Sequence, residues 1–353
     1  MQVTSEVSSR IKILRFPLIV GIVFIHAQLQ NVGEVTKFTQ TLIYYSVAQL
    51  AVPLFFIISG FLFFRDFELS FESYCKKIKA RIHTLLVPYI FWNLSFLLLL
   101  LFLQSIPGIA SFFNSGDYQK LILDYNFYDF MNAFIGLTGM PLLYQFWFIR
   151  DLMIMVLLSP IFFILAKKVP YLGLLMFAVL WILRLEDYRE VTALLFFYLG
   201  GLIIVRDWNL TWIDKHKTLI IATYLTIILT SIGLKTLDVE LFAYPLDRIT
   251  LLIGIIIGII TIWCASDLVG KKAQDILSRL SLFSFFVYAT HEPTLRIIRK
   301  LLYRVLPPSS SIAELVSYLS VPLVIIAITL AVGMVINRCT PKVFQVITGG
   351  RSA

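Results

Sequence analysis

The sequence predicts an all-α, polytopic membrane protein with about ten transmembrane helices. Of its 353 residues, 59% are hydrophobic and only 14% are charged, whereas soluble globular proteins carry about 25% charged residues. The apolar residues form long runs, which are typical of membrane helices and not of the short alternating strands of a membrane barrel. Most Lys and Arg residues lie between these runs. Together, these observations exclude a soluble enzyme, a disordered chain, a coiled coil and a disulfide-rich secreted module.

Ten apolar runs are predicted to be spans, because a helix needs about 20 mostly apolar residues to cross a bilayer. Gln28, Leu29 and Gln30 follow the first run, where a signal peptide would have small residues, so we expect that span to stay uncleaved. The fifth and sixth runs are short, which predicts tilted or partly re-entrant helices. In chain order the predicted spans are 11–30, 42–64, 83–105, 144–165, 169–184, 191–205, 217–235, 248–266, 279–304 and 313–337.

The basic residues between the spans predict the orientation. With the N-terminus in the cytoplasm, most of the 30 Lys and Arg residues fall on the cytoplasmic side, as the positive-inside rule requires. The basic cluster at 296–304 opposes the rule. The net charge of +9 is therefore interpreted as a topology signal, with no nucleic acid as partner. We expect both termini in the cytoplasm and one transmembrane domain over residues 1–353, with no fused soluble domain.

Arg15 and His26 are the most informative polar pair within a span. They are eleven residues apart in the first run, which places both on nearly the same helix face and separates them by roughly 16 Å. Ionisable groups are costly in lipid and are commonly functional there. His26 suits proton transfer, because an imidazole titrates near neutral pH and can act as a general base. The alternative is that Arg15 anchors the topology while His26 makes a structural hydrogen bond.

Two further spans carry ionisable groups. Arg150 follows Trp147 in the fourth span, and we expect it in the outer half of the membrane, with a local Arg150–Asp151 pair as the alternative. His291 and Glu292 lie near the middle of the ninth span, where the alternative is a structural hydrogen bond at a helix kink. No His residue has a carboxylate at helical ligand spacing, so no metal site is predicted.

The basic segment before the third span allows two interpretations. It contains Lys77, Lys79 and Arg81. Positive-inside charge and attraction to anionic lipid suffice to explain it. It would also serve as a phosphate-binding mouth on the cytoplasmic side.

The order and spacing of several stretches resemble a known family. Arg15, ten intervening residues and His26 resemble the Arg-x10-His motif of the acyltransferase family 3 membrane proteins. Further stretches from about residue 10 to 337 resemble other blocks of that family. These are 52–62 in the second span, the basic loop ending in Arg81 and followed by Pro88 and Tyr89, 146–152 in the fourth span, 197–201, and 281–293 in the ninth span.

The resemblance implies acyl transfer, most often O-acetylation of a cell-surface polysaccharide or its lipid-linked precursor, in the bacterial cytoplasmic membrane. The implied donor is cytoplasmic acyl-coenzyme A, with acetyl-coenzyme A preferred, and polysaccharide assembly machinery is an implied partner. By position, His26 is the implied catalytic residue and Arg15 its motif partner, while Arg150 or backbone donors would stabilise the oxyanion. The implied coenzyme contacts are Lys77, Lys79 and Arg81, and the implied pore-lining or substrate residues are Ser59, Trp147, Tyr288, His291 and Glu292.

Two departures from the family separate this chain from some of its members. We expect it to have no extracytoplasmic esterase-like domain of the kind that some members carry, and its basic loop has mostly Lys where an Arg pair is common. Two other functions stay open. One is a non-enzymatic transporter or exporter of a lipid-linked sugar or small solute, and the other is a structural partner in a polysaccharide synthase complex. His26 distinguishes a transporter from an acyltransferase, because a transporter would tolerate Gln at this position and an enzyme that needs a general base would not.

Overall fold

The computed structural model describes residues 4–106, 120–183, 189–237, 240–241, 244–305 and 310–350. In these ranges the regular secondary structure is helical apart from a two-residue antiparallel ladder of β1 (Glu240–Leu241) and β2 (Tyr244–Pro245), and loops join the helices. The α-helices are α1 (Ser5–His26), α2 (Glu34–Ser46), α3 (Ala51–Phe64), α4 (Phe71–Arg81), α5 (Val87–Ser105), α7 (Phe127–Ile135), α8 (Trp147–Leu157), α9 (Ser159–Lys168), α10 (Pro170–Leu183), α11 (Arg189–Val205), α12 (Lys217–Leu237), α13 (Leu246–Ser266), α14 (Lys271–Leu280), α15 (Ser284–Val305), α16 (Ser311–Cys339) and α17 (Pro341–Thr348).

Each predicted span falls on helix, but fewer helices qualify as spans on their own. Five helical stretches are long and apolar enough to cross a membrane, and a sixth qualifies if the two halves of a helix pair bent by 59° count as one span. The five are Glu34–Phe64, Phe71–Ser105, Trp212–Lys235, Ile249–Ser266 and Ser311–Cys339, and the bent pair is Tyr144–Leu157 with Ser159–Lys168. The all-helical, multi-pass prediction is therefore confirmed, while the number of ten spans is not.

The helices that fall short do so for physical reasons. Helix α11 has only 17 residues and α10 only 14, less than the roughly 20 needed for a crossing. Helices α1 and α15 are each 22 residues long but carry several charged side chains. A charged group in a span is tolerated only when it faces the interior of the bundle. The two charged helices are also the ones that carry the site described below.

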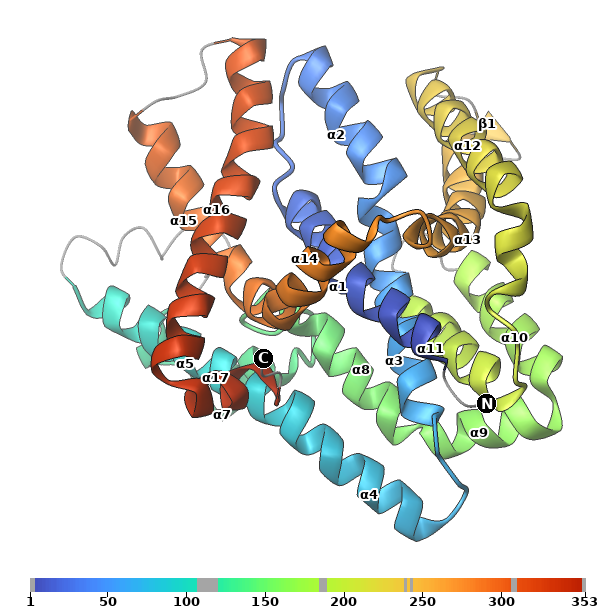
Figure 1. Cartoon of the computed structure of the whole chain (residues 1–353). Helices are drawn as coiled ribbons and strands as arrows, with labels where there is room; N and C mark the ends of the chain where they lie inside the picture. The colour runs from blue at the N-terminus through green and yellow to red at the C-terminus, as the bar shows by residue number, and fades with distance from the viewer. Residues whose placement is uncertain are drawn as a thin grey trace.

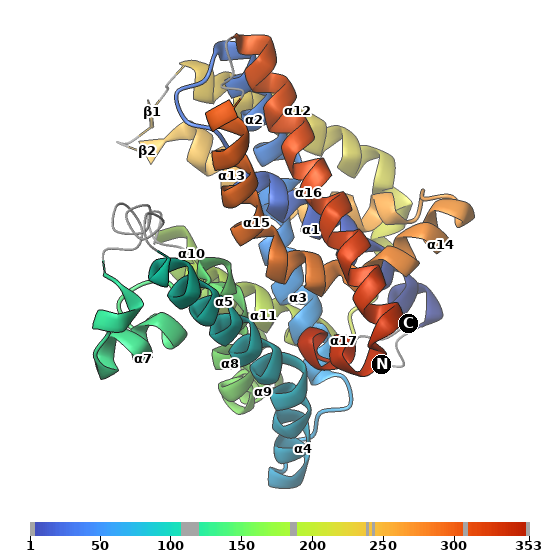
Figure 2. The same ribbon diagram turned by 90° about the vertical axis from the view of Figure 1, so that its left-hand side faces the viewer.

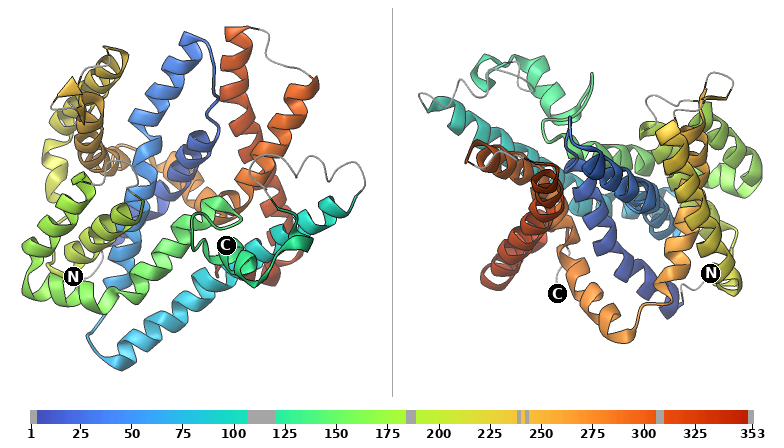
Figure 3. Two further views of the ribbon diagram at one scale, coloured as in Figure 1. Left: turned by 180° about the vertical axis from the view of Figure 1, so that it is seen from behind. Right: turned by 90° about the horizontal axis from the view of Figure 1, so that it is seen from above.

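The arrangement places α1 and α3 at the centre of the molecule (Figure 1). Helices α15 and α16 flank them on one side and α12 and α13 on the other, while α4 and α5 run below with α8 and α9. The view from above in Figure 3 shows the same division, with the α15–α16 pair and the α12–α13 pair on opposite sides of the centre. The marks for both chain ends fall on the same side of the lower half of the molecule in Figure 2, above α4.

Two glycines allow the closest helix crossing, between α3 and α11. A Cβ atom added at Gly60 would lie 2.1 Å from the Phe197 carbonyl oxygen, and one added at Gly200 would lie 2.1 Å from the Ile57 carbonyl oxygen. Small residues let backbones approach this closely, which is the usual basis of helix packing in membranes. The crossing fixes the position of Ser59, which precedes Gly60 by one residue.

A buried ion cluster ties the start of α1 to the ends of α12 and α13. The Arg10 side chain is only 4% exposed, and its guanidinium lies 2.8 Å from Asp214, 3.2 Å from Asp267 and also contacts Glu6. Lys217 lies 2.9 Å from Asp267, and its hydrogen bond lowers the pKa of that carboxyl group. Arg10 thus has a carboxylate on three sides.

Candidate functional site

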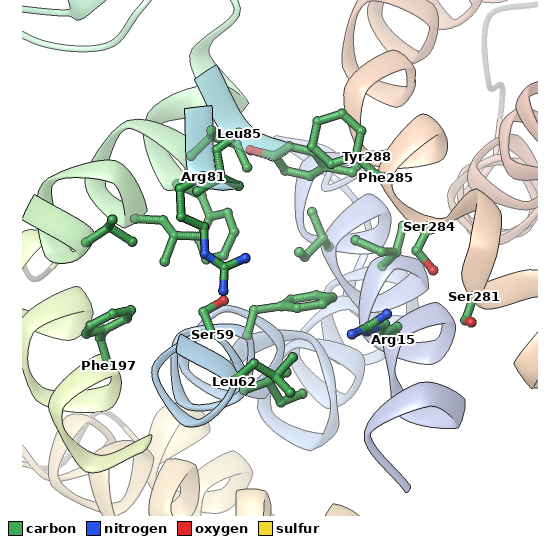
Figure 4. A pocket seen from close by; sticks show the side chains of 18 residues that line it. Arg15, Ser59, Leu62, Arg81, Leu85, Phe197, Ser281, Ser284, Phe285 and Tyr288 are labelled. Atoms are coloured by element: carbon green, nitrogen blue, oxygen red, sulfur yellow. The ribbon is translucent and has the colours of Figure 1, made fainter. Parts of the chain in front are cut away.

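The first cavity, which we call the arginine cavity, holds two of the predicted site residues. Its volume is about 170 Å³. Arg15 projects into it from α1 and Arg81 from the end of α4, on the opposite side (Figure 4). The Ser59, Ser281 and Ser284 side chains add hydroxyl groups, and the remaining lining is mainly apolar or aromatic, including Leu85, Phe148, Phe285 and Tyr288.

The electrostatics of the arginine cavity are unusual because both of its guanidinium groups lack an acidic partner. No Asp or Glu lines the cavity, and neither Arg15 nor Arg81 makes an ion pair with a described residue. Arg81 is braced over the ring of Phe63, 5.8 Å from its centroid. A charge that is taken out of water without a partner is costly, so this cavity is suited to an anionic ligand.

A local irregularity of the chain aims Arg81. The five residues Ile82–Leu86 directly after it form a π-helical turn between α4 and α5. Single π-turns inside helices shift the direction of the side chains next to them and are frequent at functional sites. Pro88 then falls in the first turn of α5, where its missing N–H costs nothing. The sequence feature that resembled a family block, a basic residue followed by Pro and Tyr, therefore lies around the π-helical turn of the continuous helical stretch Phe71–Ser105.

The second cavity, which we call the histidine cavity, has a volume of about 360 Å³. His26 lines it from the last turn of α1, and Trp147 and Arg189 line it from α8 and α11. The Arg189 guanidinium lies 5.9 Å from the centre of the Trp147 ring. The other lining residues are Ile22, Ile25, Tyr44, Gln49, Val52, Pro53, Gln145, Phe148, Trp181, Thr192, Ile255 and Tyr288.

A hydrogen-bonded chain orients His26. Arg296 Nε lies 3.1 Å from Glu292 Oε2, which holds Glu292 as a carboxylate that only accepts hydrogen bonds. The Tyr144 hydroxyl therefore donates its proton to Glu292 Oε1. With that proton committed, Tyr144 accepts a hydrogen bond from His26 Nδ1 at 2.9 Å. The neutral imidazole then carries its proton on Nδ1, and Nε2 is the nitrogen that can accept a proton.

His291 packs directly behind this chain. Its ring centre lies 5.3 Å from that of His26, and the side chain is fully buried. His291 Nδ1 donates to the Tyr288 carbonyl oxygen at 2.7 Å, while Nε2 is buried without a hydrogen-bond partner among the described residues. His291 and Glu292 line neither cavity. The structure thus brings His26, His291 and Glu292 together, with the last two behind His26 and not along a pore.

The structure places Arg150 away from both cavities. Its Nε donates to Asp151 at 2.8 Å, and its Nη1 donates to the carbonyl oxygens of Gly136 and Gly139 at 3.0 Å. Gly136 has the positive φ of 67° that favours glycine and that turns the chain after α7. Arg150 therefore holds this turn, which corresponds to the local alternative that the sequence left open.

The two lysines of the basic segment also lie outside the arginine cavity. Lys77 donates a hydrogen bond to the Arg65 carbonyl oxygen, and Lys79 is exposed to solvent. Of the three predicted coenzyme contacts, only Arg81 lines the cavity. Arg15, which the resemblance implies is the motif partner of His26 and not a coenzyme contact, also lines the arginine cavity.

Sequence reasoning missed Tyr144 and Arg296. Tyr144 lies at the predicted start of a span, where tyrosines are common as interfacial anchors, so nothing set it apart. Arg296 belongs to the basic cluster that opposed the positive-inside rule. Its spacing of four residues after Glu292 was a usable signal, since such pairs face each other on a helix. The cluster is explained by its contacts, because Arg299 also binds the Ala27 carbonyl oxygen at the end of α1, at 3.2 Å.

The parts of the chain that the structure describes contain no group of three or more His, Cys, Asp or Glu side chains placed to hold a metal ion. Two cavities hold several of the predicted site residues instead. One presents two guanidinium groups that lack a carboxylate partner among the described residues, and the other presents a histidine whose Nε2 can accept a proton.

Comparisons with known proteins identify the family of this chain. A family model described as an acyltransferase domain matches residues 9–338. The succinoglycan biosynthesis protein ExoH of Rhizobium meliloti (strain 1021) is 27% identical over 360 residues, which cover 99% of this chain and 94% of that protein. No solved structure gives a significant match. The family match covers nearly the whole chain and both cavities, so the protein belongs to acyltransferase family 3.

Proposed function

We propose that this protein transfers an acyl group from acyl-coenzyme A to a hydroxyl group of a cell-surface polysaccharide or its lipid-linked precursor. One observation carries the proposal. The arginine cavity and the histidine cavity share the lining residues Ile22, Phe148 and Tyr288, so a site for an anion and a site for a general base stand back to back. The similarity to a succinoglycan biosynthesis protein supports a polysaccharide acceptor.

Part of the donor is assigned to the arginine cavity, whose volume of about 170 Å³ is below the roughly 300–1,000 Å³ of sites that enclose a whole small molecule. Coenzyme A carries phosphate groups, and guanidinium groups bind phosphate through paired, charge-assisted hydrogen bonds. Arg15 and Arg81 lack carboxylate partners and face one cavity, so they supply such donors without first having to break an ion pair. The mainly apolar walls suit the uncharged pantetheine arm. We propose acetyl as the acyl group, because that is what the family resemblance implies.

The acceptor is assigned to the histidine cavity. Its volume of about 360 Å³ lies within the roughly 300–1,000 Å³ of small-molecule sites. Trp147 offers an aromatic face on which a sugar ring can pack. Gln49, Gln145 and Thr192 offer polar groups around it.

The residues of the histidine cavity can then perform the transfer in one displacement. His26 Nε2 takes the proton of the acceptor hydroxyl as its oxygen attacks the thioester carbonyl carbon. The new C–O bond forms, the C–S bond breaks, and the coenzyme leaves as a thiolate that recovers the proton from His26. Tyr144 and the Glu292 carboxylate stabilise the imidazolium that forms in between, through the hydrogen bond to Nδ1. Arg150 and His291 position the neighbouring backbone.

We further propose the topology that the basic residues predict. The chain would form one transmembrane domain of ten spans in the bacterial inner membrane, with both termini in the cytoplasm. Tilting of the short helices α10 and α11, and pairing of the charged helices α1 and α15 around the cavities, would account for the spans that do not qualify alone. The donor would then enter from the cytoplasm and the acceptor from the membrane or the outer face.

The test measures ester-linked acyl groups on surface glycan extracted from cells. The cells would carry the intact gene, a deletion, His26→Ala, or His216→Ala as a matched control, because His216 is exposed and lines neither cavity. Acyl groups are identified by mass and proton NMR before and after mild base. We expect the signal to vanish in the deletion and in His26→Ala and to remain in His216→Ala, with the His26→Ala and His216→Ala proteins present in the membrane at normal amounts.

Full acylation by His26→Ala would contradict the mechanism. If glycan amount or export changed in the deletion while the acyl content stayed normal, the protein would be a transporter or an assembly factor. The mass of the lost group would name the acyl substituent.

A further inference from the structure

The two cavities are separated by a wall of three side chains. Ile22 of α1, Phe148 of α8 and Tyr288 of α15 each line both cavities. If the donor lies in the arginine cavity and the acceptor next to His26, as proposed above, the acyl group has to pass this wall before it can react. The wall therefore decides which acyl groups arrive.

Two of the three side chains are fixed. The Tyr288 hydroxyl donates a hydrogen bond of 2.6 Å to the Gln145 carbonyl oxygen, and its ring lies 5.5 Å from that of Phe146. Ile22 is 6% exposed and belongs to the helix that carries Arg15 and His26. Moving Tyr288 would break its hydrogen bond to Gln145. Moving the backbone at Ile22 would change the distance between Arg15 and His26 on α1.

Phe148 differs from both. Its side chain is half-buried, and a phenylalanine has no polar group to anchor it. Its ring contacts Phe56 at 4.6 Å, Phe55 at 6.1 Å and Tyr288 at 6.2 Å between ring centres. These are nonpolar contacts, so the ring can rotate about its χ angles without the loss of a hydrogen bond. A cavity on each side provides space into which it can turn.

We propose that Phe148 is the gate between the two cavities and the residue that sets the length of the acyl group. At rest the ring closes the wall, and when it turns aside it admits a short acyl group to His26 and still blocks a longer one. The same ring keeps water in the histidine cavity away from the donor thioester. Phe148 is thus a specificity-determining residue, and this inference rests on the proposed function.

The proposal predicts two changes when the ring is removed. Discrimination by one methylene group in an apolar site is worth about 10- to 200-fold, so a wild-type preference for acetyl over butyryl of at least about tenfold should largely disappear in Phe148→Ala. Water should also reach the donor. Its oxygen would attack the thioester carbonyl, the C–S bond would break, and coenzyme A thiol and the free carboxylic acid would be released without any acceptor.

The experiment uses the full-length protein in lipid nanodiscs. Release of coenzyme A thiol is followed with acetyl-coenzyme A and with butyryl-coenzyme A, each with and without extracted glycan. The variants are Phe148→Ala and, because a cavity can destabilise the fold, the milder Phe148→Leu. The matched control is Phe162→Leu, since Phe162 is equally aromatic, is 2% exposed and lines neither cavity.

We expect the butyryl-to-acetyl rate ratio to rise by about tenfold or more in Phe148→Ala and by a smaller factor in Phe148→Leu, with more thiol released in the absence of glycan. The control should keep the wild-type ratio. An unchanged ratio and unchanged thiol release in both Phe148 variants, next to an active wild type, would overturn the gate alone. A wild type that releases no thiol from either donor with glycan present would overturn the proposed function as well.

Discussion

Arg10 and Arg15 lie five residues apart on the same helix and have opposite surroundings. Arg10 is surrounded by Glu6, Asp214 and Asp267, and it lines neither the arginine cavity nor the histidine cavity. Arg15 faces a cavity and has no carboxylate partner among the described residues. A paired buried charge is a structural element that joins helices. A buried charge that faces a cavity without a partner is better explained by a ligand that brings the opposite charge.

Among the single substitutions at the basic residues, Arg15→Gln has the largest expected effect, a loss of acyl transfer. A hydrogen bond to a charged group is worth about 1.5–3 kcal/mol, which predicts a loss of about 10- to 100-fold in kcat/KM for acetyl-coenzyme A. The loss should be absent for an acetyl-pantetheine donor, which has no phosphate. Thiol release by protein in nanodiscs checks both. An equal loss with the two donors would mean that Arg15 does not bind phosphate.

Arg10→Gln should affect stability in place of donor binding. Removal of the guanidinium leaves Asp214 and Asp267 close together without their main partner, at a cost of about 1–3 kcal/mol. We expect a lower thermal midpoint in detergent and less protein in the membrane. The activity per folded molecule and the KM for acetyl-coenzyme A should stay near the wild-type values. A raised KM at normal stability would erase the contrast between the two arginines.

Arg81→Lys is a milder change, because the charge stays while the planar fork is lost. The expected rise in KM for acetyl-coenzyme A is about tenfold or less, since one strong hydrogen bond is replaced by a weaker one. Steady-state kinetics with varied donor give this value. If Arg81→Lys and Arg81→Gln were equally impaired, geometry would matter more than charge at this position.

Lys79→Gln should have the smallest effect. The side chain is exposed and lies outside the arginine cavity, so we expect a change in kcat/KM of less than about twofold. The same donor titration measures it. A loss as large as that of Arg81→Lys would extend the phosphate site beyond the cavity along α4.

The class of fold was accessible from the sequence because long apolar runs have few alternatives to membrane helices. Both Arg15 and His26 lie on α1, as regular helix geometry predicts for one apolar run. His26 comes close to His291 only because α1 and α15 pack together, which the sequence does not reveal. The number of independent spans was harder to predict. The charges on α1 and α15 and the bend between α8 and α9 change which helices are long and apolar enough to count as membrane spans on their own.

The residues that contact the site residues could not be predicted from the sequence. Tyr144 meets His26 across 118 positions of the chain, and the wall residue Phe148 belongs to both cavities only in three dimensions. Arg150 looked like a site residue because it is charged within a span. Its contacts with the Gly136 and Gly139 carbonyl oxygens depend on a turn that the composition of the span does not reveal.

The most direct test of the central claim is the binding of coenzyme A itself. Isothermal titration in nanodiscs would compare the wild type, Arg10→Gln and the double variant Arg15→Gln/Arg81→Gln. Loss of two charge-assisted hydrogen-bond sites predicts binding about 100-fold weaker or more in the double variant, while Arg10→Gln keeps the wild-type affinity. Wild-type affinity in the double variant would show that the guanidinium groups of Arg15 and Arg81 do not bind the donor, which would contradict the proposed donor site.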